Sequence, residues 1–287
     1  MSQAEDLSHY HSRLTDLFDA TDECVVELTP EQIEFYQREG YLSGIELLSA
    51  EQVSALREEL ANFVQGSHAG QEFWYEYHSN ESSNPDTVLF HALGAWRIGR
   101  AFHDLLWSRQ FVRVAEQLLG GPVRFWHDQL FCKPAQHGGV VAWHQDYSYW
   151  TRTAPMAHLT CWIGLDASDR ENGCVQYIPR SHQWPLLPIT GLAGDMNSIR
   201  DVLNDEQWEQ FQTPVNVEMP VGYATFHHPL MVHGSRENRT TRPRRATVIN
   251  VVRDGVCSQS NEPLLAGVPA FTPGTPLGGQ FFPRLSQ

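Results

Sequence analysis

The chain has 287 residues, of which 41% are hydrophobic and 19% are charged, and its formal net charge at pH 7 is −14. This length suits one barrel-sized domain better than two small ones, and the negative charge disfavours nonspecific binding to nucleic acid or to an anionic membrane. The sequence shows neither a basic region followed by an apolar core nor an apolar run long enough for a membrane span, so we expect no signal peptide and no membrane helix.

Cysteine usage adds an expectation about location. The five cysteines are odd in number and form no closely spaced pairs. This pattern favours reduced thiols over a disulfide framework. The sequence therefore predicts a cytoplasmic protein, and we expect a monomer or a homodimer.

The N-terminal part of the chain is expected to be a tail followed by a helix. Residues 1–26 are polar and acidic and predict a flexible tail, with a short helix around Leu14–Phe18. Thr29 and Pro30 have the form of a helix N-cap with proline in the first turn. This helix should end near Gly40.

Two more helices are expected before the first strand. Ser49 and Gln52 have the spacing of a capping box, and apolar residues on one face then continue to about Val64. A third helix is predicted from about Ala101 to Leu119, because two glycines and a proline follow it.

The rest of the chain alternates short apolar segments with turns, which is typical of a β-rich fold. A long insertion, residues 183–217, either covers a site or packs outside the barrel, and the same holds for the Pro- and Gly-rich tail over 261–287. We therefore expect a single domain over residues 27–287, mainly β with flanking helices. The expected strands lie near 123–132, 140–147, 157–166, 173–178, 221–227, 230–234 and 246–253.

The most informative pattern lies at the end of the second expected strand, where the sequence is His144-Gln145-Asp146. In a strand, residues i and i+2 point to the same face, so His144 and Asp146 aim together while Gln145 faces away. Two imidazole nitrogens and one carboxylate oxygen on one face of a metal favour iron(II) and leave three positions open. With fourteen histidines in the chain such a pair can arise by chance, and a structural His–Asp hydrogen bond is the alternative.

A third ligand must come from a strand remote in sequence and near in space, as a double-stranded β-helix barrel (jelly-roll or cupin-like) allows. Three histidines compete for this position: His227, His228 and His233. The first two are adjacent and point to opposite faces of a strand, and the proline after them ends regular pairing. His233 ends an apolar run, where a ligand at the barrel rim should lie.

Arginines follow this histidine at the start of the next strand. A short hairpin places Arg244 or Arg245 beside His233, and a buried arginine needs an anionic partner. A dicarboxylate supplies one through a bidentate, charge-assisted contact. Five arginines lie between 236 and 245, which predicts either a solvated hairpin with one arginine inside or an anion-recognising rim. Lys133, the one lysine of the chain, is expected at the surface.

At this point the sequence resembles the phytanoyl-CoA dioxygenase family of Fe(II)/2-oxoglutarate oxygenases. The resemblance spans about residues 30 to 253 and implies a double-stranded β-helix fold. It rests on these residues: His144-Gln145-Asp146, Trp162, Asn172-Gly173-Cys174, Pro179 with Ser181-His182, and His233-Gly234-Ser235 with Arg244.

The resemblance implies a role for each matching residue. His144, Asp146 and His233 are implied to bind Fe(II). Arg244, taken in preference to Arg245, and Ser235 are implied to hold the far carboxylate of 2-oxoglutarate. The remaining implied cosubstrate contacts come from Trp162, Gln129 and Arg97, although relatives often carry lysine where this chain has Arg97.

The implied reaction is hydroxylation of an unactivated C–H bond of a small molecule by O₂ and 2-oxoglutarate, with release of succinate and CO₂. Desaturation or ring closure would use the same ligands. The aromatic residues Tyr147 and Trp150 are candidates for a substrate pocket. Two other functions stay open: a cupin-type metal enzyme that does not use 2-oxoglutarate, and a non-catalytic barrel that serves as a binding module.

Overall fold

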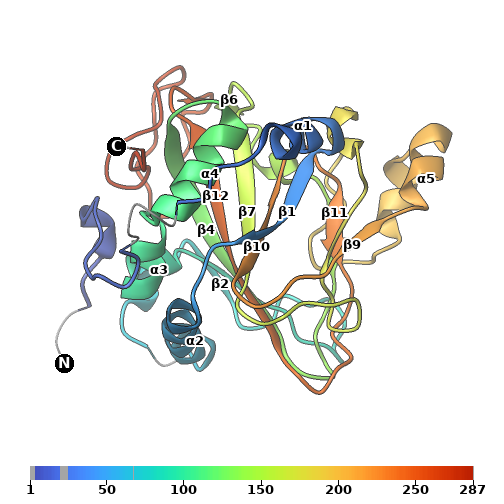
Figure 1. Ribbon diagram of the computed structural model, residues 1–287, viewed down its shortest axis with the longest axis horizontal. Coiled ribbons are helices and arrows are strands. Elements are labelled where there is room, and N and C mark those ends of the chain that lie inside the picture. Colours follow the sequence, from blue (N-terminus) through green and yellow to red (C-terminus); the bar gives the residue numbers. More distant parts are fainter. Residues whose placement is uncertain (1–3, 20–24, 67, 287) are drawn as a thin grey trace.

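Two antiparallel sheets form the centre of the molecule in a computed structural model that describes residues 4–19, 25–66 and 68–286. The larger sheet has seven strands in the order β1-β10-β7-β12-β4-β3-β2, and the smaller has four in the order β5-β11-β8-β9 (Figure 1). The strands are β1 (Tyr41–Glu46), β2 (Glu76–His78), β3 (Phe90–Leu93), β4 (Val123–Lys133), β5 (Val141–His144), β6 (Thr153–Ala154), β7 (His158–Gly164), β8 (Val175–Tyr177), β9 (Val215–Val217), β10 (Tyr223–His227), β11 (His233–Ser235), β12 (Arg244–Arg253) and β13 (Cys257–Ser258).

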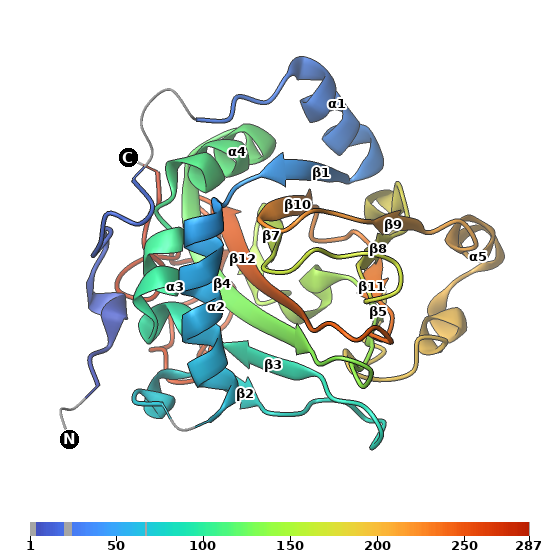
Figure 2. The same ribbon diagram turned by 60° about the horizontal axis from the view of Figure 1, so that its bottom comes forward.

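The two sheets pack face to face, and the predicted double-stranded β-helix is confirmed. In Figure 2 the strands of the small sheet lie opposite those of the large one. Phe131, Trp162 and Val248 from the large sheet and Val141 and Tyr177 from the small sheet belong to one buried cluster. This cluster forms the inner core, and the functional pocket described below opens within it.

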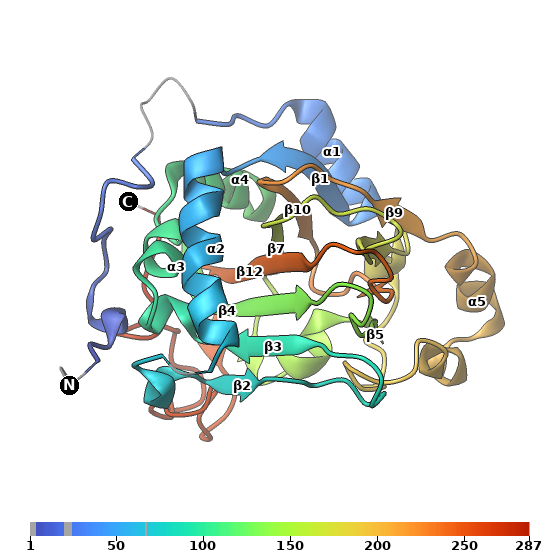
Figure 3. The same ribbon diagram turned by 90° about the horizontal axis from the view of Figure 1, so that it is seen from below.

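Four of the described helices cover the other face and one edge of the large sheet, whereas the fifth lies beyond the small sheet, next to β9 (Figure 3). The four are α1 (Pro30–Glu39), α2 (Ala50–Val64), α3 (Arg100–Leu105) and α4 (Arg109–Leu119), and the fifth is α5 (Asp205–Phe211). The predicted capping boxes at Thr29 and Ser49 are both present. The predicted third helix is two helices, because Ser108 takes an extended conformation (ψ 120°) and starts α4 anew.

Several elements were not predicted: β1, β2, β3, β6, β9, β13 and α5. All are short, and β2 and β9 lie at sheet edges, so their periodicity is weak in the sequence. The insertion 183–217 contributes β9 and α5, and its Trp184 and Trp208 pack outside the small sheet. The C-terminal segment instead joins the cluster between the large sheet and the helices, through Leu277 and Phe282 among others.

The N-terminal segment was predicted to be a loose tail, but its described residues 4–19 are anchored to the domain. The backbone N–H groups of Leu14 and Thr15 each donate to the buried carboxylate of Asp104 at 2.8 Å, and the expected helix at this point does not form. Residues 20–24, including Cys24, lie outside the described part. No helix among the described residues is long and apolar enough to cross a membrane.

Arg97 is one of the anchors of this segment, which corrects its expected cosubstrate role. Its guanidinium forms an ion pair with Asp6, donates to the carbonyl of Phe73 at 2.9 Å, and lies 5.1 Å from the centroid of the Phe281 ring. Both side chains of the ion pair are largely buried. The partner that satisfies Arg97 is therefore an acidic residue of the chain itself.

We predict that Asp6→Asn lowers the unfolding free energy by about 1–3 kcal/mol, because Arg97 then stays buried without its counter-ion. Burial raises the pKa of Asp6, but hydrogen bonds from Arg97 and Ser8 outweigh it and leave the pKa below its ordinary value. The stability difference between wild type and variant should be fully present above about pH 4 and shrink as the pH falls further. Urea unfolding at pH 7 and pH 3 measures it, and a variant as stable as wild type at both would contradict the anchoring role.

Candidate metal centre

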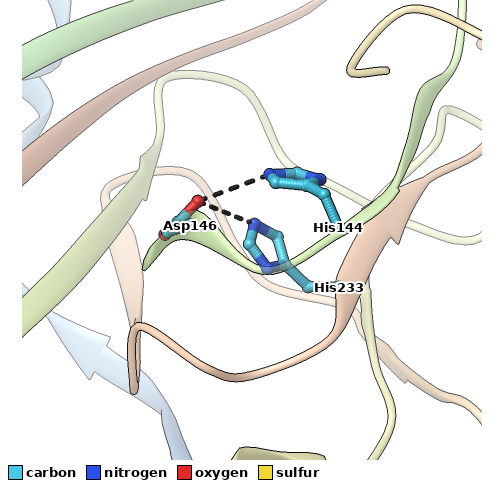
Figure 4. A group of neighbouring side chains, drawn as sticks. All are labelled: His144, Asp146 and His233. Carbon is cyan, nitrogen blue, oxygen red and sulfur yellow. Dashed lines mark ion pairs between the residues drawn. The ribbon is translucent and has the colours of Figure 1, made fainter. Parts of the chain in front are cut away.

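His144, Asp146 and His233 come together at one edge of the inner core (Figure 4). The pairing of β11 with β5 places His233 directly opposite His144. Asp146 Oδ1 lies 3.3 Å from Nε2 of His144 and 3.6 Å from Nε2 of His233. One ligand atom from each residue lies within 4.8 Å of the others, so the three can hold a single metal ion.

The backbone fixes both histidine rings with Nε2 toward this point. Nδ1 of His144 lies 2.8 Å from the carbonyl of Ala142, and Nδ1 of His233 lies 2.9 Å from the carbonyl of Met231. A carbonyl only accepts, so each Nδ1 carries the proton and each Nε2 presents a lone pair. Burial, with His144 and His227 nearby, holds the pKa of His233 well below its ordinary value, which keeps the imidazole neutral.

The two oxygens of Asp146 have separate partners. Oδ2 accepts a hydrogen bond from the hydroxyl of Thr160 at 2.6 Å and lies 3.0 Å from Nε2 of His227. His227 is fixed in turn by the hydroxyl of Tyr177, 2.9 Å from its Nδ1. Burial raises the pKa of Asp146, but hydrogen bonds to its carboxylate, including that of His227, outweigh burial and hold the pKa well below its ordinary value. Oδ1 is therefore an ionised oxygen held toward the two ligand nitrogens.

The structure gives a different role to each of the three histidines that were candidates for the third metal ligand. His233 carries the third donor atom, His227 supports the carboxylate from behind, and His228 turns the other way, with its ring 5.3 Å from that of His182. Gln145 also faces away as predicted, and its side chain binds the backbone of Leu187 and Leu230.

A pocket beside the three donors ends at Arg244, which is 1% exposed. Its Nη2 donates to the carbonyl of Gly173 at 2.9 Å and to Oγ of Ser235 at 3.2 Å, while its Nε has no partner. The guanidinium carbon lies 5.6 Å from the centre of the Trp162 ring. Burial lowers the pKa of Arg244 to about 10, so the side chain stays charged at neutral pH. This end of the pocket suits an anion.

Strand alternation decides between the two neighbouring arginines. Arg245 points to the opposite face of β12, where its Nε and Nη2 each bind Asp166 at 2.8 Å. Of these two arginines, only Arg244 lines the pocket. Arg242 and Arg239 bind Asp169 and Glu237 at the surface, which favours the solvated hairpin over an anion-recognising rim.

Lys133 is not at the surface, and that expectation was wrong. Its side chain is fully buried at the end of β4, directly opposite Arg244 in the register of β4 and β12. Its Nζ donates to Oγ of Ser235 at 2.6 Å and to the carbonyls of Ser235 and Arg236. The hairpin 235–243 accepts the hydrogen bonds of this lysine, and Gly138 packs against its Cβ.

The other predicted site residues divide into two groups. Gln129 and Trp162 line the pocket, whereas Arg97 does not. Tyr147 and Trp150 also lie outside its lining: the hydroxyl of Tyr147 binds the carbonyl of Thr153, and Trp150 is buried against His158. Residues Asp146–Tyr149 form a 3-10 helix rather than a strand, which changes the direction of the aromatic side chains.

Because of that helix, a different aromatic residue lies next to the donors. Tyr149 is 41% exposed, and its ring centroid is 6.2 Å from that of His144. Sequence reasoning also missed Thr160, although a signal existed. It stands two residues before Trp162 on β7, and the period of a strand puts both on the inner face.

Comparison with known proteins identifies relatives over most of the chain. The family model for phytanoyl-CoA dioxygenase (PhyH) matches residues 36–246. A probable alpha-ketoglutarate-dependent hypophosphite dioxygenase from Stutzerimonas stutzeri is 27% identical over 76% of this chain and 77% of its own. A phytanoyl-CoA dioxygenase from Arabidopsis thaliana is 27% identical over 82% of this chain and 92% of its own.

A solved structure shares the fold. The epimerase SnoN, crystallised with Fe³⁺, alpha-ketoglutarate and nogalamycin RO, superposes with a TM-score of 0.71 and 23% identity, covering 89% of this chain and 97% of its own. These proteins differ widely in the molecules that their names give as substrates.

We predict that His144→Ala abolishes binding of a divalent metal and that Thr160→Val weakens it about ten- to a hundredfold, because Asp146 loses the hydrogen bond that orients it. Calorimetric titration with Mn²⁺ measures both effects. The matched control is His228→Ala, which removes a neighbouring histidine that faces away and should leave the affinity unchanged. A metal affinity lost equally in His228→Ala, or kept in His144→Ala, would rule out the assigned donor set.

Proposed function

The chain belongs to the phytanoyl-CoA dioxygenase family, and from this premise we propose that it hydroxylates an unactivated C–H bond of a small-molecule metabolite with release of succinate and CO₂. It is an Fe(II)- and 2-oxoglutarate-dependent dioxygenase, like its relatives. We also propose which residues carry this chemistry and from which side the substrate approaches.

One observation supports the proposal most: two histidine nitrogens and one carboxylate oxygen share a face beside a buried arginine without a counter-ion. That donor set suits Fe(II) and leaves positions for a chelating 2-oxo acid and for O₂. Among the described residues no carboxylate lies within 4.0 Å of the Arg244 guanidinium, so a bound dicarboxylate would supply the missing charge.

When bound, Fe(II) and 2-oxoglutarate supply oxidative chemistry that couples decarboxylation of the oxo acid to oxidation of a C–H bond. The protein's residues bind and orient. We assign the far carboxylate of 2-oxoglutarate to Arg244 and Ser235. Trp162 and Val248 exclude water from the middle of the pocket, and Thr160 with His227 holds Asp146 ionised and directed at the metal position. Gln129 contributes the one amide of the lining, fixed by His91 at 2.9 Å.

We place the approach of the substrate on the side of Tyr149 and Leu192. Leu192 belongs to the insertion and lines the pocket, and its carbonyl accepts a hydrogen bond from Ala142 at 2.7 Å. Tyr149 presents an exposed ring next to His144. An apolar side chain and an aromatic ring at the entrance suit a substrate with a carbon skeleton, and the insertion covers part of the pocket.

Neither alternative accounts for the same residues. A metal enzyme that does not use 2-oxoglutarate would leave the buried Arg244 without a partner. A non-catalytic barrel does not need three donors whose orientations are each fixed by a further hydrogen bond. We also place the enzyme in the cytoplasm, on the basis that Cys132, Cys161, Cys174 and Cys257 are all free thiols.

We predict that Arg244→Ala weakens 2-oxoglutarate binding about a hundredfold, because the charge-assisted contact to the far carboxylate is lost. The visible absorption band of the Fe(II)–2-oxoglutarate chelate, titrated without oxygen, reports the affinity. The matched control is Arg245→Ala, which removes the outward arginine and should leave the affinity as in wild type. A wild-type protein that shows no band and releases no succinate in air would overturn the proposed function.

We predict that Tyr149→Ala raises the substrate KM about tenfold and leaves the dissociation constant of 2-oxoglutarate unchanged, since the ring lies on the substrate side. The substrate is first found by screening metabolite pools for molecules that stimulate succinate release. Tyr147→Phe, which removes only a buried hydrogen bond, is the control and should behave as wild type. An unchanged KM in Tyr149→Ala would show that the substrate enters at another side of the pocket.

A further inference from the structure

Lys133 and Arg244 form a buried pair of basic residues, and burial together with the neighbouring Arg244 holds the pKa of Lys133 well below its ordinary value. The two residues are direct partners in the antiparallel register of β4 and β12, and both side chains are almost completely buried on the inner face. Like charges directly opposite each other on a sheet destabilise it. Among the described residues no carboxylate lies within 4.0 Å of either cation.

The hydrogen bonds of Lys133 show that it does not reach the pocket itself. Its Nζ lies 3.1 Å from the carbonyl of Ser235, 2.6 Å from Oγ of the same residue and 2.5 Å from the carbonyl of Arg236. A lysine ammonium has three N–H donors, so these three acceptors use all of them. Asn238 binds the carbonyl of Lys133 at 3.2 Å and keeps the strand end in place.

Counting the hydrogen bonds of Ser235 in the same way fixes the direction of its hydroxyl proton. A hydroxyl oxygen has two lone pairs and one proton. Both lone pairs of Ser235 Oγ are occupied, one by Lys133 at 2.6 Å and one by Arg244 at 3.2 Å. Ser235 lines the pocket, so the remaining O–H group is left to donate into it.

We propose that Lys133 is a positioning residue for the cosubstrate: it orients the Ser235 hydroxyl as a donor to the far carboxylate of 2-oxoglutarate. The inference rests on the proposed function. It explains why the chain's one lysine is buried against Ser235, since its hydrogen bond to Oγ leaves the hydroxyl proton free to donate to a bound carboxylate.

The test compares two ligands on the Fe(II)-loaded protein without oxygen: 2-oxoglutarate, and 2-oxovalerate, which has the same chelating group and chain length but no second carboxylate. We expect Lys133→Met to weaken 2-oxoglutarate binding about ten- to a hundredfold and to change 2-oxovalerate binding less than about twofold. We expect the same pattern for Ser235→Ala: weaker binding of 2-oxoglutarate and nearly unchanged binding of 2-oxovalerate. The double variant should bind 2-oxoglutarate no more weakly than the weaker single variant, because both substitutions remove one contact.

The matched control is Arg245→Met, which removes a neighbouring cation from the outer face of β12 and should leave both affinities unchanged. Equal loss for both ligands in Lys133→Met, or additive losses in the double variant, would assign Lys133 to the structure of the hairpin and overturn the inference. If Lys133→Met does not fold, Lys133→Gln, which keeps two donors without the charge, takes its place. Failure of both to fold also overturns it. Absence of 2-oxoglutarate binding in wild type overturns the proposed function together with this inference, whereas wild-type binding with an unaffected lysine variant overturns the inference alone.

Discussion

The antiparallel pairing of β11 with β5 is the constraint on which the site depends. It sets His233 opposite His144 although 88 residues separate them along the chain. Each ring is then held by the carbonyl of the residue two positions earlier in the chain, so the backbone also selects the tautomer. A register slip of one residue would turn either ligand to the outer face. The ligand geometry is thus a property of strand pairing rather than of side-chain flexibility.

Charge is distributed unevenly through this core. At one end Asp146 is surrounded by histidines and one hydroxyl, and at the other Lys133 and Arg244 lie without a carboxylate. Buried charges are stable when they are paired, and an unpaired one costs free energy that the rest of the fold must offset. A metal cation at the acidic end and a dicarboxylate reaching the basic end would neutralise both. The polarity of the pocket therefore matches the polarity of a metal-chelated 2-oxo diacid, with the chelating end at Asp146.

The sequence was sufficient to predict the parts of the site that follow local periodicity. The shared direction of His144 and Asp146 follows from a strand period of two. The same period requires Arg244 and Arg245 to point to opposite faces, but it does not decide which of them points inward. Features that depend on distant partners were not predictable in this way. Arg97 is satisfied by an aspartate that lies 91 residues earlier, and Lys133 is buried by a hairpin that lies about a hundred residues later. Tyr149 was missed because the chain leaves the strand at Asp146 for a 3-10 helix, where a different period applies.

The residues that carry the chemistry and the residues at the entrance also differ in how the fold holds them. The metal donors, the carboxylate-binding residues and their supports lie on or near the ends of strands β4, β5, β7, β10, β11 and β12, whose pairing holds them in place. The entrance is built differently. Tyr149 ends a 3-10 helix, and Leu192 lies in a turn of the insertion, held by one backbone contact to β5. Such segments can change length and side chains without moving the strands. A rigid reaction centre with an adaptable entrance accounts for relatives whose names give substrates as different as hypophosphite and phytanoyl-CoA. Selectivity in this chain is therefore to be sought in the end of the 3-10 helix beyond Asp146 and in the insertion, not in the residues that hold the metal.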